Sequence, residues 1–138
     1  MTAVAERPGS DQPDGRVEER EFSADSACVA EAREFVVLAV DDAAMAEGLR
    51  LVVSELATNA VLHARSGFRV RVATGATVVR VEVFDNSELP PTRKEYGPSA
   101  VTGRGLGIVE HIAARWGVTA LPVGKVVWFE MERQEFWT

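Results

Sequence analysis

The segment Leu51–Ala64, with the sequence LVVSELATNAVLHA, carries the clearest structural signal in the chain. Its apolar residues recur at spacings of three and four, which predicts an amphipathic helix. We expect this helix to begin at Asp42 or Ala43 and to end at Ala64. Its buried stripe consists of Met45, Leu49, Val52, Val53, Leu56 and Ala60.

Three polar side chains interrupt this helix where a core helix is usually apolar. Glu55, Asn59 and His63 are spaced by four residues, so they stack along one side, the first two at the edge of the apolar stripe and His63 within it. A carboxylate or carboxamide there is costly without partners. Glu55 can accept a proton or orient water, and the Asn59 oxygen suits Mg²⁺. Alternatively, Glu55 and Asn59 extend to solvent, and His63 is an ordinary core or rim histidine.

The residues around this helix predict a mixture of helices and strands without strict alternation. The expected elements are a short edge strand over 16–22, helices over 26–41 and 42–64, strands over 68–73 and 77–84, a helix over 105–116, and a hairpin of strands over 117–121 and 125–132. This order predicts an α+β fold, a two-layer sandwich of a mixed, mostly antiparallel sheet with helices on one face.

Composition bounds the class of protein. The chain has 138 residues, of which 46% are hydrophobic and 26% are charged, so we expect a single domain, over 16–138. Residues 1–15 contain glycine, proline and serine without periodicity, so we expect a mobile tail there. The formal charge of −6 disfavours direct nucleic-acid binding, which needs clustered basic residues. A single cysteine, Cys28, and the lack of an apolar run of ~20 residues favour a cytoplasmic protein without a membrane partner.

A second polar signal stands at the end of a predicted strand. The sequence VEVFDNS over 81–87 is rich in valine up to Asp85. A carboxylate at a strand end that points into a pocket can accept a hydrogen bond from an exocyclic amine such as that of adenine. The alternative is that Asp85 and Asn86 only initiate a turn. The long loop that follows, over 85–102, is typical of a lid.

A third signal is the glycine-rich stretch Thr102–Ile108, TGRGLGI, just before an apolar helix. Glycines let backbone N–H groups approach phosphate oxygens, and a helix N-terminus favours an anion. Arg104 could add a charged contact. The glycine spacing fits neither the dinucleotide fingerprint nor the Walker A motif. The alternative is a flexible helix start.

Taken together, these segments resemble the GHKL superfamily, whose ATP-binding domain has the Bergerat fold. Glu55–Ala60 looks like its N box, Val83–Ser87 like its G1 box and Gly103–Ile108 like its G2 box. The closest likeness is to the short anti-sigma-factor serine/threonine kinases, and it covers about residues 22–132. Three motifs in the right order and spacing are much more specific than any one of them.

The resemblance implies a set of roles for these residues. Glu55 would be the general base, Asn59 would hold Mg²⁺, and Asp85 would bind the adenine amine. The residues implied in nucleotide binding are Asn59, His63, Asp85, Ser87, Thr102, Gly103, Arg104, Gly105, Leu106 and Gly107. ATP and Mg²⁺ are the implied cofactors.

The resemblance also implies a regulatory function. We expect a serine/threonine kinase that phosphorylates an anti-sigma-factor antagonist of the STAS type and also acts as an anti-sigma factor by binding a sigma factor. The alternatives are a non-catalytic, ATP-gated module that sequesters a partner protein, and a domain that keeps only protein contacts. A homodimer could form through the edge strand over 16–22.

Overall fold

The computed structural model describes residues 15–63, 67–86 and 105–133, with the backbone alone for 63 and 105–108. The elements are β1 (Arg16–Phe22), α1 (Ala27–Val40), α2 (Ala43–His63), β2 (Phe68–Thr74), β3 (Val78–Asp85), α4 (Gly105–Ile112), β4 (Arg115–Ala120) and β5 (Lys125–Glu132). In this part of the chain every helix is too short or too polar to cross a membrane.

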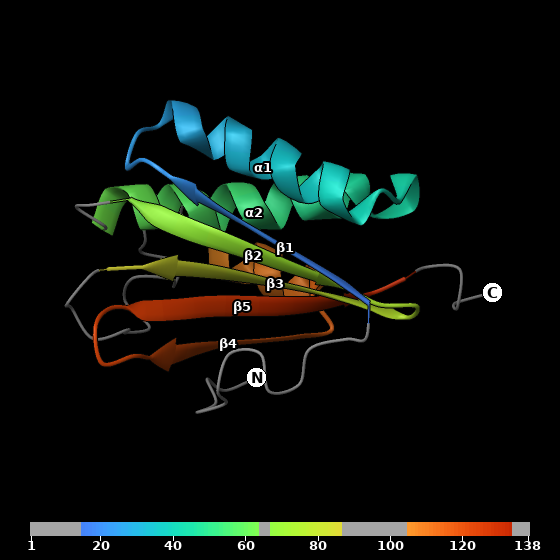
Figure 1. Cartoon of the computed structure of the whole chain (residues 1–138). Coiled ribbons are helices and arrows are strands. Elements are labelled where there is room, and N and C mark those ends of the chain that lie inside the picture. Colours follow the sequence, from blue (N-terminus) through green and yellow to red (C-terminus); the bar gives the residue numbers. More distant parts are fainter. Residues whose placement is uncertain (1–14, 64–66, 87–104, 134–138) are drawn as a thin grey trace.

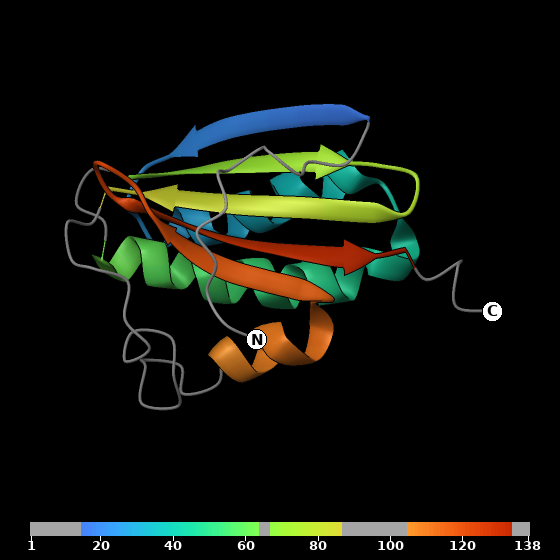
Figure 2. The same cartoon turned by 90° about the horizontal axis from the view of Figure 1, so that it is seen from below.

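The described strands form one five-stranded sheet in the order β1-β2-β3-β5-β4, and neighbouring strands are antiparallel (Figure 1). The helices α1 and α2 lie over one face of this sheet, and α4 lies beside α2 at the β4 edge (Figure 2). The predicted α+β sandwich with helices on one face is therefore confirmed, with a sheet that is antiparallel throughout the described strands.

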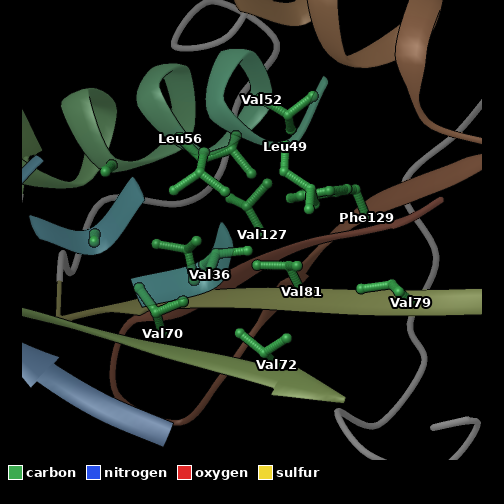
Figure 3. Close-up of a cluster of buried hydrophobic side chains, with 14 of the residues drawn as sticks. Val36, Leu49, Val52, Leu56, Val70, Val72, Val79, Val81, Val127 and Phe129 are labelled. Atoms are coloured by element: carbon green, nitrogen blue, oxygen red, sulfur yellow. The ribbon is translucent and has the colours of Figure 1, made fainter. Parts of the chain in front are cut away.

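One hydrophobic core joins the helices to the sheet. Alternate residues of each strand point toward the helices, because successive side chains of a strand point to opposite faces. Figure 3 shows Leu49, Val52 and Leu56 of α2 facing Val81 and the other core residues of the sheet. The labelled core residues from α1 and the strands are Val36, Val70, Val72, Val79, Val81, Val127 and Phe129. The predicted stripe of α2 is buried throughout, which fixes the rotation of this helix about its axis.

The helix predicted over 105–116 ends earlier than expected, at Ile112, so the prediction is wrong for its last turn. Trp116 instead lies in β4, where it pairs with Phe129 and is buried. Pairing with the valine-rich β5 buries this large side chain in the core. The other element boundaries agree with the predicted ones to within one or two residues.

The sheet face opposite the helices carries a buried group of ion pairs centred on Arg80. Its guanidinium lies 3.2 Å from Glu82 Oε2 and 2.9 Å from Glu130 Oε2, and it sits over the ring of Trp128. Arg80 and Glu82 are each 1% exposed. A buried charge that loses its partner is strongly destabilising, so Arg80 holds two carboxylates in place.

We predict that Arg80→Met lowers the free energy of unfolding by about 3 kcal/mol, because Glu82 and Glu130 lose their shared buried cation. Urea denaturation measures the change. Arg20→Met is the matched control, since Arg20 pairs with Glu31 at 3.7 Å on an exposed surface and such pairs contribute less than about 1 kcal/mol. Equal losses in the two variants would contradict this account of the sheet.

Candidate functional site

Helix α2 presents Glu55 and Asn59 on the side where α4 packs. A Cβ atom added to Gly48 of α2 would lie 3.2 Å from Ile112 Cγ2 of α4, so the two helices approach closely there. Glu55 and Asn59 follow Gly48 by about two and three helical turns and lie on the same side. Figure 2 shows α4 running antiparallel to α2. The N-terminal end of α4, at Gly105, therefore lies toward the Asn59 end of α2.

Both polar residues of α2 are shielded from water, Asn59 almost completely and Glu55 in part. Asn59 is 4% exposed, which excludes the alternative that its side chain extends to solvent. Glu55 is partly exposed, but its Oε2 atom is buried and has no hydrogen-bond partner within the described part of the chain. Burying a polar atom without a partner is unfavourable. The Glu55 carboxylate therefore suits a ligand that supplies the missing partner, and the buried Asn59 carboxamide lies one helical turn away.

Asp85 lies at the end of β3, as predicted, and is 5% exposed. Its antiparallel neighbour across the sheet is Lys125, the first residue of β5. The Lys125 ammonium nitrogen lies 3.7 Å from Asp85 Oδ2, and Lys125 is fully buried. Val83 and Val127, two residues away in each strand, belong to the core. Asp85 and Lys125 therefore point to the helix side of the sheet.

These groups gather at one end of the domain although they are far apart in sequence. The C-terminal half of α2, the end of β3, the start of β5 and the N-terminus of α4 lie at the same end in Figure 2. Together they offer a carboxylate, a carboxamide, a carboxylate–ammonium pair and a positive helix end. Such a set suits a molecule with a hydrogen-bonding base at one end and anionic groups at the other.

The donor set also suits Mg²⁺. This ion prefers oxygen ligands and keeps several waters, so it commonly takes only one or two protein ligands. The Asn59 carboxamide oxygen is a ligand of the required type. No cluster of three acidic, histidine or cysteine side chains that could hold a metal occurs in the described ranges, so a dedicated all-protein cage is absent from them.

The remaining predicted site residues are placed only in part. His63 ends α2, and Gly105, Leu106 and Gly107 form the first turn of α4, for which the backbone alone is described. The predicted residues Ser87, Thr102, Gly103 and Arg104 lie outside the described residues. The predicted roles of all these residues stay predictions.

A separate cavity of about 430 Å³ lies at the other end of α4. Met45 and Gly48 of α2, Ile112 of α4 and Met131 of β5 line it. None of the predicted site residues whose side chains are described contributes to its wall. The polar groups singled out in the sequence therefore belong to a different place from this cavity.

Sequence reasoning missed Lys125. It belongs to the stretch Gly124–Trp128, which resembles a closing segment of the short kinase class, but it was not expected to be a site residue. Its role depends on the register of β3 with β5, which brings together residues 40 positions apart. The signal that could have found it is the run of apolar residues over 126–129 that follows, because a lysine buried beside such a run needs a partner.

The chain belongs to the family of the histidine kinase-like ATPase domain, whose family model matches residues 20–131. It therefore contains a domain of an ATP-binding, kinase-like family, as the motifs led us to expect. No curated protein is significantly similar to it in sequence.

A solved structure with the same fold is the histidine kinase domain from Erythrobacter litoralis EL346 blue-light activated histidine kinase. The two chains superpose with a TM-score of 0.53 at 20% sequence identity. The match covers 80% of this chain and 61% of that one, so this chain spans less than two thirds of its length. At this identity the likeness establishes the fold alone.

The turn between β4 and β5 supports the Asp85 end of the site. Gly124 has a φ of 85°, and a Cβ atom added there would collide with the carbonyl oxygen of Asp85. Glycine is therefore required both by the left-handed backbone conformation and by the close approach to β3.

We predict that Gly124→Ala destabilises the domain by at least about 1–2 kcal/mol, the cost of a left-handed residue with a Cβ atom, and also weakens ATP binding by displacing Asp85. Urea denaturation and calorimetric titration with Mg·ATP measure the two effects. Leu38→Ala, at an exposed position of α1 away from this turn, is the control and should change neither. Unchanged stability and affinity in Gly124→Ala would refute this role of the turn.

Proposed function

We propose that this protein is an ATP- and Mg²⁺-binding regulatory serine/threonine kinase. Its substrate would be a serine on an anti-sigma-factor antagonist of the STAS type, and it would also act as an anti-sigma factor. The observation that carries the proposal is the pair formed by the buried Asn59 and by Glu55, whose Oε2 atom is buried, on the α4 side of α2. The chain belongs to the histidine kinase-like ATPase family.

Each residue of the site has a separate role in the proposed phosphoryl transfer. Asp85 accepts a hydrogen bond from the exocyclic amine of adenine, which orients the nucleotide. The Asn59 oxygen would hold Mg²⁺, which would neutralise charge on the phosphates. The N-terminus of α4 favours the anionic phosphates. Positioning and electrostatic stabilisation of this kind account for most of the catalysis of phosphoryl transfer.

Glu55 is the general base of the proposed reaction. The serine oxygen forms a bond to the γ-phosphorus while the bond from that phosphorus to the β–γ bridging oxygen breaks, and ADP leaves. The serine hydroxyl proton passes to the Glu55 carboxylate. The buried Oε2 of Glu55, without a hydrogen-bond partner in the described residues, is the acceptor available for this proton.

We predict that Glu55→Gln lowers phosphoryl transfer at least about 100-fold while the affinity for ATP changes little, because the amide keeps the shape of the side chain but cannot accept the proton. The measurement is transfer of labelled phosphate from ATP to a purified STAS-type protein from the same genome, beside a calorimetric ATP titration.

Glu47→Gln, at an exposed position of the same helix, is the control and should transfer at the wild-type rate. Transfer by Glu55→Gln at the wild-type rate would exclude Glu55 as the base. ATP binding by the wild type without any transfer would instead favour a non-catalytic, ATP-gated module that sequesters its partner.

A further inference from the structure

We infer that the segment over 134–138, with the sequence QEFWT, docks into the cavity between α2, α4 and β5, and that the indole of Trp137 fills this cavity. The segment follows directly on Arg133 and lies outside the described residues. The cavity has a volume of about 430 Å³, within the range of pockets that bury small organic molecules, so it has room for an indole. This docking is independent of the proposed function.

The wall of the cavity has an apolar part and a polar part. Met45, Ile112 and Met131 supply the apolar part. His111 and Glu132 also line the cavity and are exposed, so it opens to solvent on their side. A tryptophan has an apolar ring body and one N–H donor, and methionine sulfur makes favourable contacts with aromatic rings. An indole therefore matches this wall better than a purely apolar or a purely charged group.

The chain reaches the cavity at the end of β5. Glu132, the last residue of this strand, lines the cavity, and Arg133 comes next. The Arg133 backbone N–H donates to the Thr77 carbonyl oxygen at 2.9 Å, and its guanidinium nitrogen lies 2.8 Å from Asp42 Oδ2. Asp42 directly precedes α2, and Ala44 in the first turn of this helix also lines the cavity. Arg133 is therefore held beside the cavity.

The length of the segment suits this cavity. A residue spans at most about 3.3–3.6 Å, so Trp137 can lie up to ~14 Å from Arg133. Because Arg133 is already anchored, docking orders only the residues over 134–137 and costs little conformational entropy. A side chain on so short a tether has an effective concentration of the order of mM at the cavity, which favours it over a free ligand or a second copy of the chain.

The composition of the segment also favours docking. Phe136 and Trp137 are two aromatic residues among five, whereas only 7% of the whole chain is aromatic. An aromatic side chain in water exposes a large apolar area, and its burial is favourable in proportion to that area. Phe136 has no polar atom to match His111 and Glu132 at the opening, so we assign the cavity to Trp137.

Docking of Trp137 would hold α4 in place. This helix has only eight residues, and isolated helices of that length are marginal in water. Its last residue, Ile112, lines the cavity together with Met45 of α2 and Met131 of β5. An indole packed between these three side chains ties the C-terminal end of α4 to α2 and β5. The backbone amides of α4 then open less often and exchange their hydrogens more slowly.

The first experiment uses the wild-type chain, so that folding of a variant does not enter. NMR of protein with ¹³C-labelled methionine methyl groups detects nuclear Overhauser effects, which report close contacts, from the indole protons of Trp137 to these methyl groups. We expect contacts to Met45 and Met131 that disappear in Trp137→Ala. No contact from Trp137 to either methyl group would overturn the inference, and would leave the cavity to a small molecule or to another protein.

A mixed sample separates docking within one chain from exchange between two chains. Labelled Trp137→Ala is mixed with an equal amount of unlabelled wild type, so that only the segment of another chain can contact the labelled methyl groups. We expect no contact in this sample. Contacts as strong as those within the labelled wild type would mean that the segment docks into a second copy, which would overturn the inference.

The second experiment measures the energetic effect of the docked side chain. Trp137→Ala should lower the Tm by about 5 °C, and it should speed hydrogen exchange of the α4 backbone amides about tenfold. Leu38→Ala, which removes an exposed apolar side chain of α1, is the control and should change neither. Wild-type Tm and exchange in Trp137→Ala, or losses confined to Phe136→Ala, would overturn the inference.

Discussion

The contact between α2 and the sheet is the constraint on which the rest of the structure depends. The apolar stripe of this helix, with Leu49, Val52 and Leu56, is fully or almost fully buried against the valine-rich strands. Burial of this stripe fixes the rotation of α2 about its axis. That rotation places Glu55 and Asn59 on the side toward α4. The packing of the core therefore also determines the direction in which the polar groups of the site point.

The site is assembled from the ends of elements and not from one local motif. Asp85 ends β3, Lys125 begins β5, and α4 begins at Gly105 close to the Asn59 end of α2. The rigid sheet holds the carboxylate and the ammonium in register, whereas the helices contribute side chains and a positive dipole end. In such an arrangement the stable core holds polar groups in position. Burial of these groups alone would lower the stability of the fold.

Much of this fold could be predicted from the sequence, because its elements have strong and local signals. The three- and four-residue spacing located α2, and the alternation around Val81 located β3. The predicted end of α4 was wrong, because Trp116 does not continue this helix but lies in β4, where pairing with β5 buries it. The pairing of Asp85 with Lys125 and the ion pairs of Arg80 with Glu130 could not be predicted. Both depend on the register of distant strands, which local spacing does not encode.

The most direct test is a crystal structure of the protein with Mg²⁺ and a non-hydrolysable ATP analogue. The proposed site predicts Mg²⁺ at about 2.0–2.1 Å from the Asn59 carboxamide oxygen and the adenine edge against Asp85. A nucleotide bound in the cavity between Met45 and Ile112, or one that contacts neither Asn59 nor Asp85, would contradict it.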